Sequence, residues 1–306
     1  MRLEGIHHVT AITGDAPRNV DFYTRVMGLR LVAKTVNQDD PSVYHLFYAS
    51  EAGKPGSELT FFEYPGAVPG RTGAGMVHRI ISRVGSPEAL DFWAKRLEDE
   101  GIAVERDGDR LRFDDFEGLG HELVVSDADE PLRAEHPEVP QEFALGGFDG
   151  VRAYAADAAQ SGRLLEDVLG AESAGDAAWE LRGERRGSTI SYDAPPAEPG
   201  QQSAGTVHHV AWGTTVKEHP EWLHQLAESG VRSTPIIDRF YFHSIYFREP
   251  SGVLFEIADD GPGFTVDGPV AELGSKIILP PFLEDRREEI EARLTPLPDP
   301  RGEAVS

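Results

Sequence analysis

The chain contains no cysteine, which excludes disulfides, thiolate nucleophiles and thiolate metal sites. Basic residues are also scarce, because 29 Lys and Arg stand against 53 Asp and Glu and leave a formal net charge of −24. Nucleic-acid binding needs a basic face for the phosphates, which this composition does not favour. No apolar run reaches the roughly 18 residues of a membrane helix, and the N-terminus lacks a signal-peptide pattern. We therefore expect a cytoplasmic protein with no nucleic-acid and no membrane partner.

What is present is the composition of a globular protein. Hydrophobic residues make up 40% of the chain and charged residues 27%, which is sufficient for a sizeable core. At about 100 to 200 residues per domain, a length of 306 residues allows roughly two domains.

One pattern of a strand, a helix and three further strands recurs four times along the chain. The copies open near Gly5, Gly75, Gly147 and Gly205. Their predicted helices are PRNVDFYTRVMGL, PEALDFWAKRLEDE, AAQSGRLLEDVLG and HPEWLHQLAESG, with apolar residues at helical spacing and a glycine at or just after the end. The intervening segments alternate in part and are separated by Pro and Gly turns. An α+β fold of four βαβββ modules is the simplest interpretation.

The longest linker, SDADEPLRAEHPEVPQ, is acidic and separates two halves of the chain. The tail segment FLEDRREEIEARL, whose apolar residues include Phe282 and Ile290, is predicted to form an amphipathic closing helix. We predict an N-terminal module pair over 1–130, an acidic linker over 131–146, a C-terminal module pair over 147–262 and a tail over 263–306.

Histidines and acidic residues recur at equivalent positions of the repeat. Three residues after the opening glycine stand His8 in the first copy and His78 in the second. The fourth copy has a doublet, from which the distance to its helix selects His209. The last strand of each copy is also preceded or opened by a glycine. Four residues after that glycine stand, in chain order, Thr60, Glu122, Ser191 and Glu256.

Pairing of the first copy with the fourth would gather His8, His209 and Glu256 around one cavity. Two histidines and one carboxylate form the ligand set of non-haem Fe(II) oxygenases, which keep positions open for substrate and O₂. The second and third copies would supply only His78 and Glu122, too few for tight metal binding. A lone strand histidine is usually a hydrogen-bonded core residue, but repeated doublets with a phased glutamate favour a metal site.

A tyrosine is predicted to lie beside this site. If the strands around EPSG pair symmetrically about Ser251, Tyr246 lies directly opposite Glu256 on the same face of the sheet. A phenol there could hydrogen-bond a bound substrate oxygen and stabilise developing charge.

Four segments together resemble the vicinal oxygen chelate superfamily, and within it the dioxygenases that cleave hydroquinone rings. They are GIHHVTAITGDAPRNVDFYTRVMGLRLVAKTVNQDD, GTVHHVAWGT, DRFYFHSIYFREPSGVLFEIADDGPGFTVD and LGSKIILPPFLEDRREEIEARLTPLP, and the resemblance covers nearly the whole chain. It implies the vicinal oxygen chelate fold, with two paired-module domains. It also implies Fe(II) held by His8, His209 and Glu256, ligands that Mn(II) accepts as well.

The resemblance further implies that several residues around the metal belong to the site. His243 stands close to them in the sequence and is an alternative proton-transfer residue. The residues that the resemblance itself implies are His7, Thr10, His208, Arg239 and Tyr246.

The implied activity is extradiol-type cleavage of a hydroquinone or catechol-like diol by O₂. Two alternatives stay open. A glyoxalase-like lyase or isomerase would use a divalent metal without O₂, but it needs a fourth ligand that Thr60 does not readily provide. A non-catalytic protein that binds aromatic compounds, as resistance proteins of the superfamily do, would not need three ligands to converge. Small βαβββ sheets often bury their edges between subunits, so a homo-oligomer is compatible with the sequence.

Overall fold

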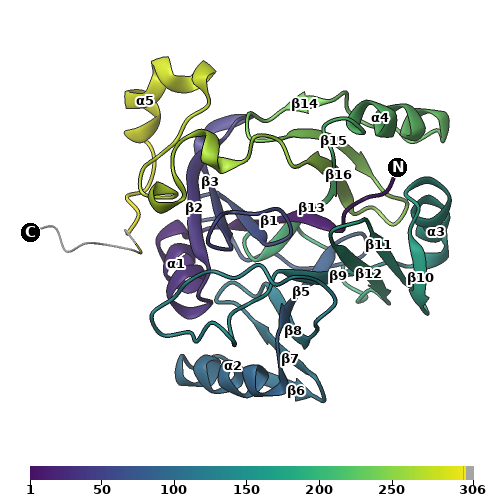
Figure 1. The fold of residues 1–306 in the computed structure, drawn as a ribbon, viewed down its shortest axis with the longest axis horizontal. Coiled ribbons are helices and arrows are strands. Elements are labelled where there is room, and N and C mark those ends of the chain that lie inside the picture. Colours follow the sequence, from purple (N-terminus) through teal and green to yellow (C-terminus); the bar gives the residue numbers. More distant parts are fainter. Residues whose placement is uncertain (299, 301–306) are drawn as a thin grey trace, which may run out of the picture.

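The computed structural model describes residues 1–298 and 300, and this part of the chain forms two eight-stranded sheets with short helices outside them (Figure 1). The strand order is β14-β15-β16-β13-β1-β4-β3-β2 in the first sheet and β10-β11-β12-β9-β5-β8-β7-β6 in the second. Each sheet therefore joins two βαβββ modules, the first with the fourth and the second with the third. The four modules and the pairing that the metal site requires are confirmed. Each sheet thus combines one module from the segment 1–130 with one module from the segment 147–262.

The first sheet contains the strands of the outer modules. The first module supplies β1 (Ile6–Thr13), β2 (Arg30–Asn37), β3 (Asp40–Ala49) and β4 (Glu58–Glu63). The fourth supplies β13 (Thr206–Thr214), β14 (Ile237–Asp238), β15 (His243–Arg248) and β16 (Leu254–Asp259). Of these, β14 has only two residues, because most of the preceding segment 231–236 runs outside the sheet.

The second sheet is built in the same way from the inner modules. The second module supplies β5 (Val77–Val84), β6 (Val104–Asp107), β7 (Arg110–Asp114) and β8 (Gly120–Val125). The third supplies β9 (Phe148–Tyr154), β10 (Glu172–Gly175), β11 (Ala178–Arg182) and β12 (Gly187–Asp193).

The four predicted helices are present, and two of them end differently from the prediction. Helices α2 (Pro87–Asp99) and α4 (His219–Glu228) are α-helical throughout. Helices α1 (Ala16–Asp21) and α3 (Ala158–Arg163) continue as π-helical turns over Phe22–Val26 and Leu164–Val168. A wider turn of this kind shifts the following side chains around the helix axis. None of the helices in the described residues is long and apolar enough to cross a membrane.

The closing helix of the tail is shorter than predicted. A 3₁₀ segment over Pro281–Arg286 precedes α5 (Arg287–Glu291). Because successive residues of a 3₁₀ turn point about 120° apart, Leu283 faces the core while Phe282 faces solvent and is 63% exposed. Phe282 therefore lies outside the buried apolar face of the predicted amphipathic helix, whereas Ile290 is buried. Residues 299 and 301–306 of the predicted tail lie outside the described residues.

A buried hydrogen-bond cluster ties the first module to the second sheet. The Tyr23 hydroxyl, on the π-helical turn after α1, donates to Asp115 at 2.8 Å and lies 3.0 Å from Nε2 of His121 on β8. All three side chains are buried. Burial, together with the nearby charge of Arg79, lowers the pKa of His121 to about 3, so this histidine is neutral in the folded protein at neutral pH.

His121 should contribute to loss of stability in acid. The unfolded chain binds a proton at this residue near pH 6.5, whereas the folded chain binds it only near pH 3. The unfolded state then carries more protons, so stability falls as the pH falls through this window, by about 1.4 kcal/mol per pH unit for one group. We measure the free energy of unfolding in urea between pH 7 and 5. We expect its slope against pH to be smaller in the His121→Gln variant, by an amount that corresponds to the uptake of about one proton on unfolding. His224→Gln, at an exposed histidine, is the control, and an unchanged slope in His121→Gln would contradict the assignment.

Candidate metal centre

Three buried ligand atoms converge where the first module meets the fourth. Nε2 of His8 on β1 lies 3.3 Å from Nε2 of His209 on β13. Oε2 of Glu256 on β16 lies 3.3 Å from the first nitrogen and 3.0 Å from the second. The three residues predicted as metal ligands are therefore brought together, in a nearly equilateral triangle, and all are buried.

Two β-bulges explain how neighbouring histidines come to face the same side. The register of β1 against β13 runs from Ile6 opposite Trp212 to His8 opposite Ala211, which leaves His7 as an extra residue. On β13 the same happens at His208, between the pairs formed by His209 and Val207. Successive side chains of a regular strand point to opposite faces, and a bulge re-aims one of them. Both members of each doublet can therefore meet.

The first doublet fixes the proton of one ligand. Nε2 of His7 lies 3.1 Å from the backbone carbonyl oxygen of Asp259, which can only accept, so Nε2 carries the proton. Burial lowers the pKa of His7 to about 3, with help from His8 and Arg186, so its Nδ1 is an acceptor. Nδ1 of His8 lies 3.0 Å from it and must donate. The remaining nitrogen of His8, Nε2, then presents a lone pair to the centre of the triangle.

The second doublet is arranged in the same way. Nδ1 of His208 lies 2.8 Å from Nδ1 of His209, and burial lowers the pKa of His208 to about 3. His7 and His208 therefore lie behind the ligands and orient them. Such hydrogen bonds to the outer ring nitrogen are the usual support of metal-bound histidines.

The carboxylate has one occupied and one open oxygen. Ser244 on β15 donates a hydrogen bond of 2.5 Å to Oε1 of Glu256, while Oε2 is buried without a hydrogen bond among the described residues. Burial by itself would raise the pKa of Glu256, but His8 and His209 outweigh it and hold this pKa well below its ordinary value. The group is thus the anion that a metal requires. Ser244 was not predicted, since nothing in the sequence distinguishes this serine.

These atoms fit a divalent cation. Ligands about 2.1 Å from a metal are about 3.0 Å apart on the face of an octahedron and about 3.4 Å apart in a tetrahedron. The edges of the triangle, 3.0 to 3.3 Å, lie in this range. Thr60, at the predicted fourth position, is instead hydrogen-bonded to the side chains of Thr10 and His45.

A small pocket opens beside the triangle. The predicted hairpin register is confirmed, because Tyr246 pairs directly with Glu256. The Arg239 guanidinium donates to the Tyr246 hydroxyl at 3.3 Å and pairs with Asp39 at 3.1 Å. Burial and the charge of Glu256 raise the pKa of Tyr246, so this phenol keeps its proton. The pocket is lined by both histidine ligands, Arg239, Tyr246, His45, Phe47, Phe62, Phe242 and the turn between β2 and β3.

The loop that carries Arg239 has a strained backbone. Phe240 has φ of 71°, a left-handed conformation that bulky residues rarely adopt, and Tyr241 N–H bonds back to the carbonyl of Arg239 at 2.9 Å. His243, just beyond this loop, is not among the pocket residues. Its Nδ1 lies 2.9 Å from the Asp259 carboxylate.

Thr10 acts through neighbours rather than on the pocket itself. Its hydroxyl lies 2.7 Å from the Thr60 hydroxyl, which in turn lies 2.9 Å from Nε2 of His45 on β3. His45 lines the pocket, and sequence reasoning missed it. The repeat gives no signal for it, because the recurring histidines and carboxylates stand on the first and last strands of each module, whereas His45 stands on the third strand.

The second sheet has no comparable cluster among the described residues. Glu122 is held by Arg110 and, at 2.8 Å, by Arg112. His78 instead pairs with Asp193 at 2.8 Å. The two side chains therefore have different partners.

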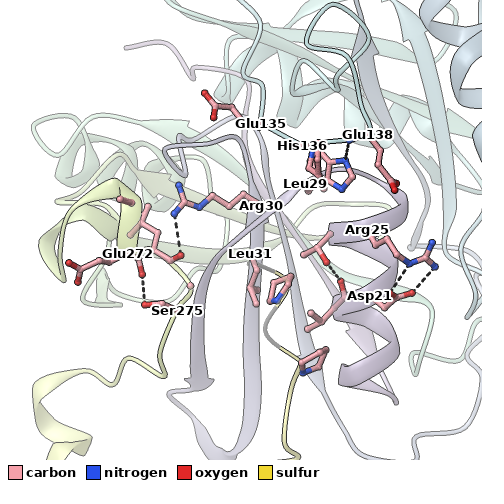
Figure 2. A pocket seen from close by; sticks show the side chains of 18 residues that line it. Asp21, Arg25, Leu29, Arg30, Leu31, Glu135, His136, Glu138, Glu272 and Ser275 are labelled. Carbon is pink, nitrogen blue, oxygen red and sulfur yellow. Dashed lines mark hydrogen bonds and ion pairs between the residues drawn. The ribbon is translucent and has the colours of Figure 1, made fainter. Parts of the chain in front are cut away.

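A larger cavity lies elsewhere, between the first helix, β2 and the tail (Figure 2). It has a volume of about 890 Å³, and two of the arginines that line it are engaged by other groups. Arg25 pairs with Asp21 at 2.8 Å, and Arg30 donates to the carbonyl of Val270 at 2.5 Å. No cluster of metal-ligating groups in the described residues lies there.

Comparisons with known proteins agree with this architecture. The family model of the Glyoxalase/Bleomycin resistance protein/Dioxygenase superfamily matches residues 5–129 and 147–257. A Bacillus subtilis protein named "Putative ring-cleaving dioxygenase MhqA" is 40% identical over 97% of this chain and 100% of its own length. The chlorohydroquinone/hydroquinone 1,2-dioxygenase of Sphingobium indicum is 31% identical over 94% and 95% of the two chains. A crystal structure of a B. subtilis protein superposes with a TM-score of 0.91, at 39% identity, over 97% and 98%. The predicted vicinal oxygen chelate fold is confirmed.

Removal of the open carboxylate should abolish metal binding. Glu256→Gln keeps the shape of the side chain but loses its negative charge, so we expect bound Fe(II) or Mn(II) to fall from near one ion per chain to well below a tenth of that after dialysis. Glu122→Gln is a matched control, because Glu122 is equally buried on the last strand of its module. Metal content is measured by atomic emission on folded, purified protein. Equal metal content in both variants would show that the triangle does not hold the ion.

Proposed function

Because the chain belongs to the glyoxalase/bleomycin resistance protein/dioxygenase superfamily, we propose that it is an Fe(II)-dependent ring-cleaving dioxygenase of a hydroquinone or catechol-like aromatic diol. The proposed cleavage is of the extradiol type and places both atoms of O₂ in a ring-opened acid. The names of two relatives, a ring-cleaving dioxygenase and a hydroquinone 1,2-dioxygenase, support this activity.

The observation that carries the proposal is the triangle of two histidines and one carboxylate without a fourth protein ligand. Three protein ligands leave coordination positions for both substrate and O₂, which is the arrangement of non-haem Fe(II) oxygenases. When bound, Fe(II) supplies the electron transfer that O₂ chemistry needs. A lyase of this fold would be better served by a fourth ligand, and Thr60 is engaged with Thr10 and His45.

The side chains of the pocket have separate tasks. Phe47, Phe62 and Phe242 supply apolar surface for an aromatic ring. The Tyr246 hydroxyl, protonated and bonded to Arg239, can donate to a substrate oxygen as negative charge develops there. His7 and His208, held neutral by burial, keep the ligands in the tautomer that faces the metal.

Oxygen uptake tests the activity directly. Protein purified without O₂ and loaded with Fe(II) is mixed with hydroquinone, methylhydroquinone or catechol, and metal content is measured on the same sample. We expect substrate-dependent uptake at near one iron per chain. Bound metal without uptake for any diol would replace the proposal with a lyase-type reaction, and absence of metal would replace it with a binding protein.

Tyr246 should matter for turnover and not for metal binding. Tyr246→Phe keeps the ring beside His209, 5.8 Å between ring centres, and removes the hydroxyl. We expect kcat to fall on the order of 10²-fold with unchanged iron content. Tyr154→Phe, on β9 of the other sheet, is the control and should retain wild-type turnover. Full turnover in Tyr246→Phe would exclude a role for the phenol.

A further inference from the structure

His45 is a pocket residue with no place in the proposed site so far. It stands on β3, in register with Phe62 of β4, and its ring packs against two phenylalanines. The ring centre of His45 lies 4.0 Å from that of Phe47 and 4.4 Å from that of Phe62, and all three residues line the pocket. These contacts restrict the movement of the imidazole.

One nitrogen of His45 is engaged and the other is not. Nε2 lies 2.9 Å from the Thr60 hydroxyl, which lies 2.7 Å from the Thr10 hydroxyl. Within residues 1–298 and 300, Nδ1 of His45 has no hydrogen-bond partner. His45 lines the pocket, and a ring nitrogen without a partner there is suited to bind a polar group of the ligand.

The hydrogen-bond chain lets this nitrogen either donate or accept. The pKa of His45 lies well below its ordinary value because of burial and the nearby His8, His209 and Arg239, so the ring is neutral. If His45 donates to Thr60, Nδ1 is an acceptor. If Thr10 donates to Thr60 and Thr60 to His45, Nδ1 is a donor. These states are the two tautomers of the neutral ring, and the hydroxyl groups of Thr60 and Thr10 can rotate to satisfy either one. The nitrogen can therefore pair with a phenolic hydroxyl, which is itself both donor and acceptor.

Arg239 is less well placed to be the sole polar contact for the substrate. Its guanidinium already pairs with Asp39 and donates to the hydroxyl of Tyr246. The two hydroxyl groups of a hydroquinone cannot both reach one metal ion, so a second polar group in the pocket is required.

We propose that His45 is a substrate-binding residue that hydrogen-bonds a hydroxyl of the aromatic diol through Nδ1, held in position by the chain of Thr10 and Thr60. This inference rests on the proposed function. It makes the pocket selective for ring compounds with a free hydroxyl over their ethers.

The test compares ligands with and without hydroxyl groups. Affinities of Fe(II)-loaded protein for hydroquinone, 4-methoxyphenol and 1,4-dimethoxybenzene are measured without O₂ by calorimetry. In His45→Phe, which keeps an aromatic ring between Phe47 and Phe62, we expect affinity for hydroquinone to fall about tenfold and affinity for dimethoxybenzene to change less than twofold. If the affinity of His45→Phe for 4-methoxyphenol falls as well, His45 contacts the hydroxyl on the metal side. If only the affinity for hydroquinone falls, His45 contacts the other hydroxyl.

Further variants separate the contact from a general change of shape. Thr60→Val cuts the chain and should lower hydroquinone affinity in the same direction, whereas Thr60→Ser should retain it. His224→Phe, at an exposed residue, should match the wild type. Wild-type affinities for all three ligands in His45→Phe, or an equal loss for all three, would overturn the proposal. If the wild type binds hydroquinone but shows no O₂ uptake, the proposed activity is contradicted. The affinities of the variants would still decide whether His45 contacts the ligand.

Discussion

The site depends on the pairing of β1 with β13 at the centre of the first sheet. These strands come from opposite ends of the chain, and their antiparallel ladder is the place where the first and fourth modules meet. A bulge on each strand gives both histidine doublets the same geometry, so His8 and His209 approach across the ladder to 3.3 Å. Without this pairing the first module would contribute only His8 to the triangle and the fourth only His209 and Glu256, so the three ligand atoms would not converge.

The bulges also set the chemistry of the ligands. Because His7 is re-aimed toward His8, a carbonyl of β16 can determine, through His7, which nitrogen of His8 is free. That carbonyl belongs to Asp259, three residues after Glu256 on the same strand. The strand that supplies the carboxylate thus also orients a histidine of another module, so ligand position and ligand tautomer are set by one sheet.

Features of the site that depend on periodicity could be predicted from the sequence, whereas features that depend on packing could not. Counting along the repeat located His8, His209 and Glu256, and symmetry about Ser251 placed Tyr246 opposite Glu256, because strand register obeys a period of two. Bulges break that period, and no local pattern marks them. His45 and Ser244 are ordinary strand residues until β3 and β15 bring them beside Thr60 and Glu256. Phe282 was misplaced because the tail begins as a 3₁₀ turn.

The second sheet explains why the same framework holds one candidate site and not two. Its central strands carry the equivalent bulges, at His78 on β5 and Asp149 on β9. There the extra residues are held by other side chains, since His78 is hydrogen-bonded to Asp193 and Asp149 pairs with Arg83. Arginines also neutralise Glu122. Its counterpart in the first sheet, Glu256, has one carboxylate oxygen without a hydrogen bond among the described residues. Arg110 and Arg112 each donate to one oxygen of Glu122, and their positive charges would repel a cation. The difference between ion-pair network and metal site therefore lies in which side chains surround the bulges, and the backbone fold is common to both.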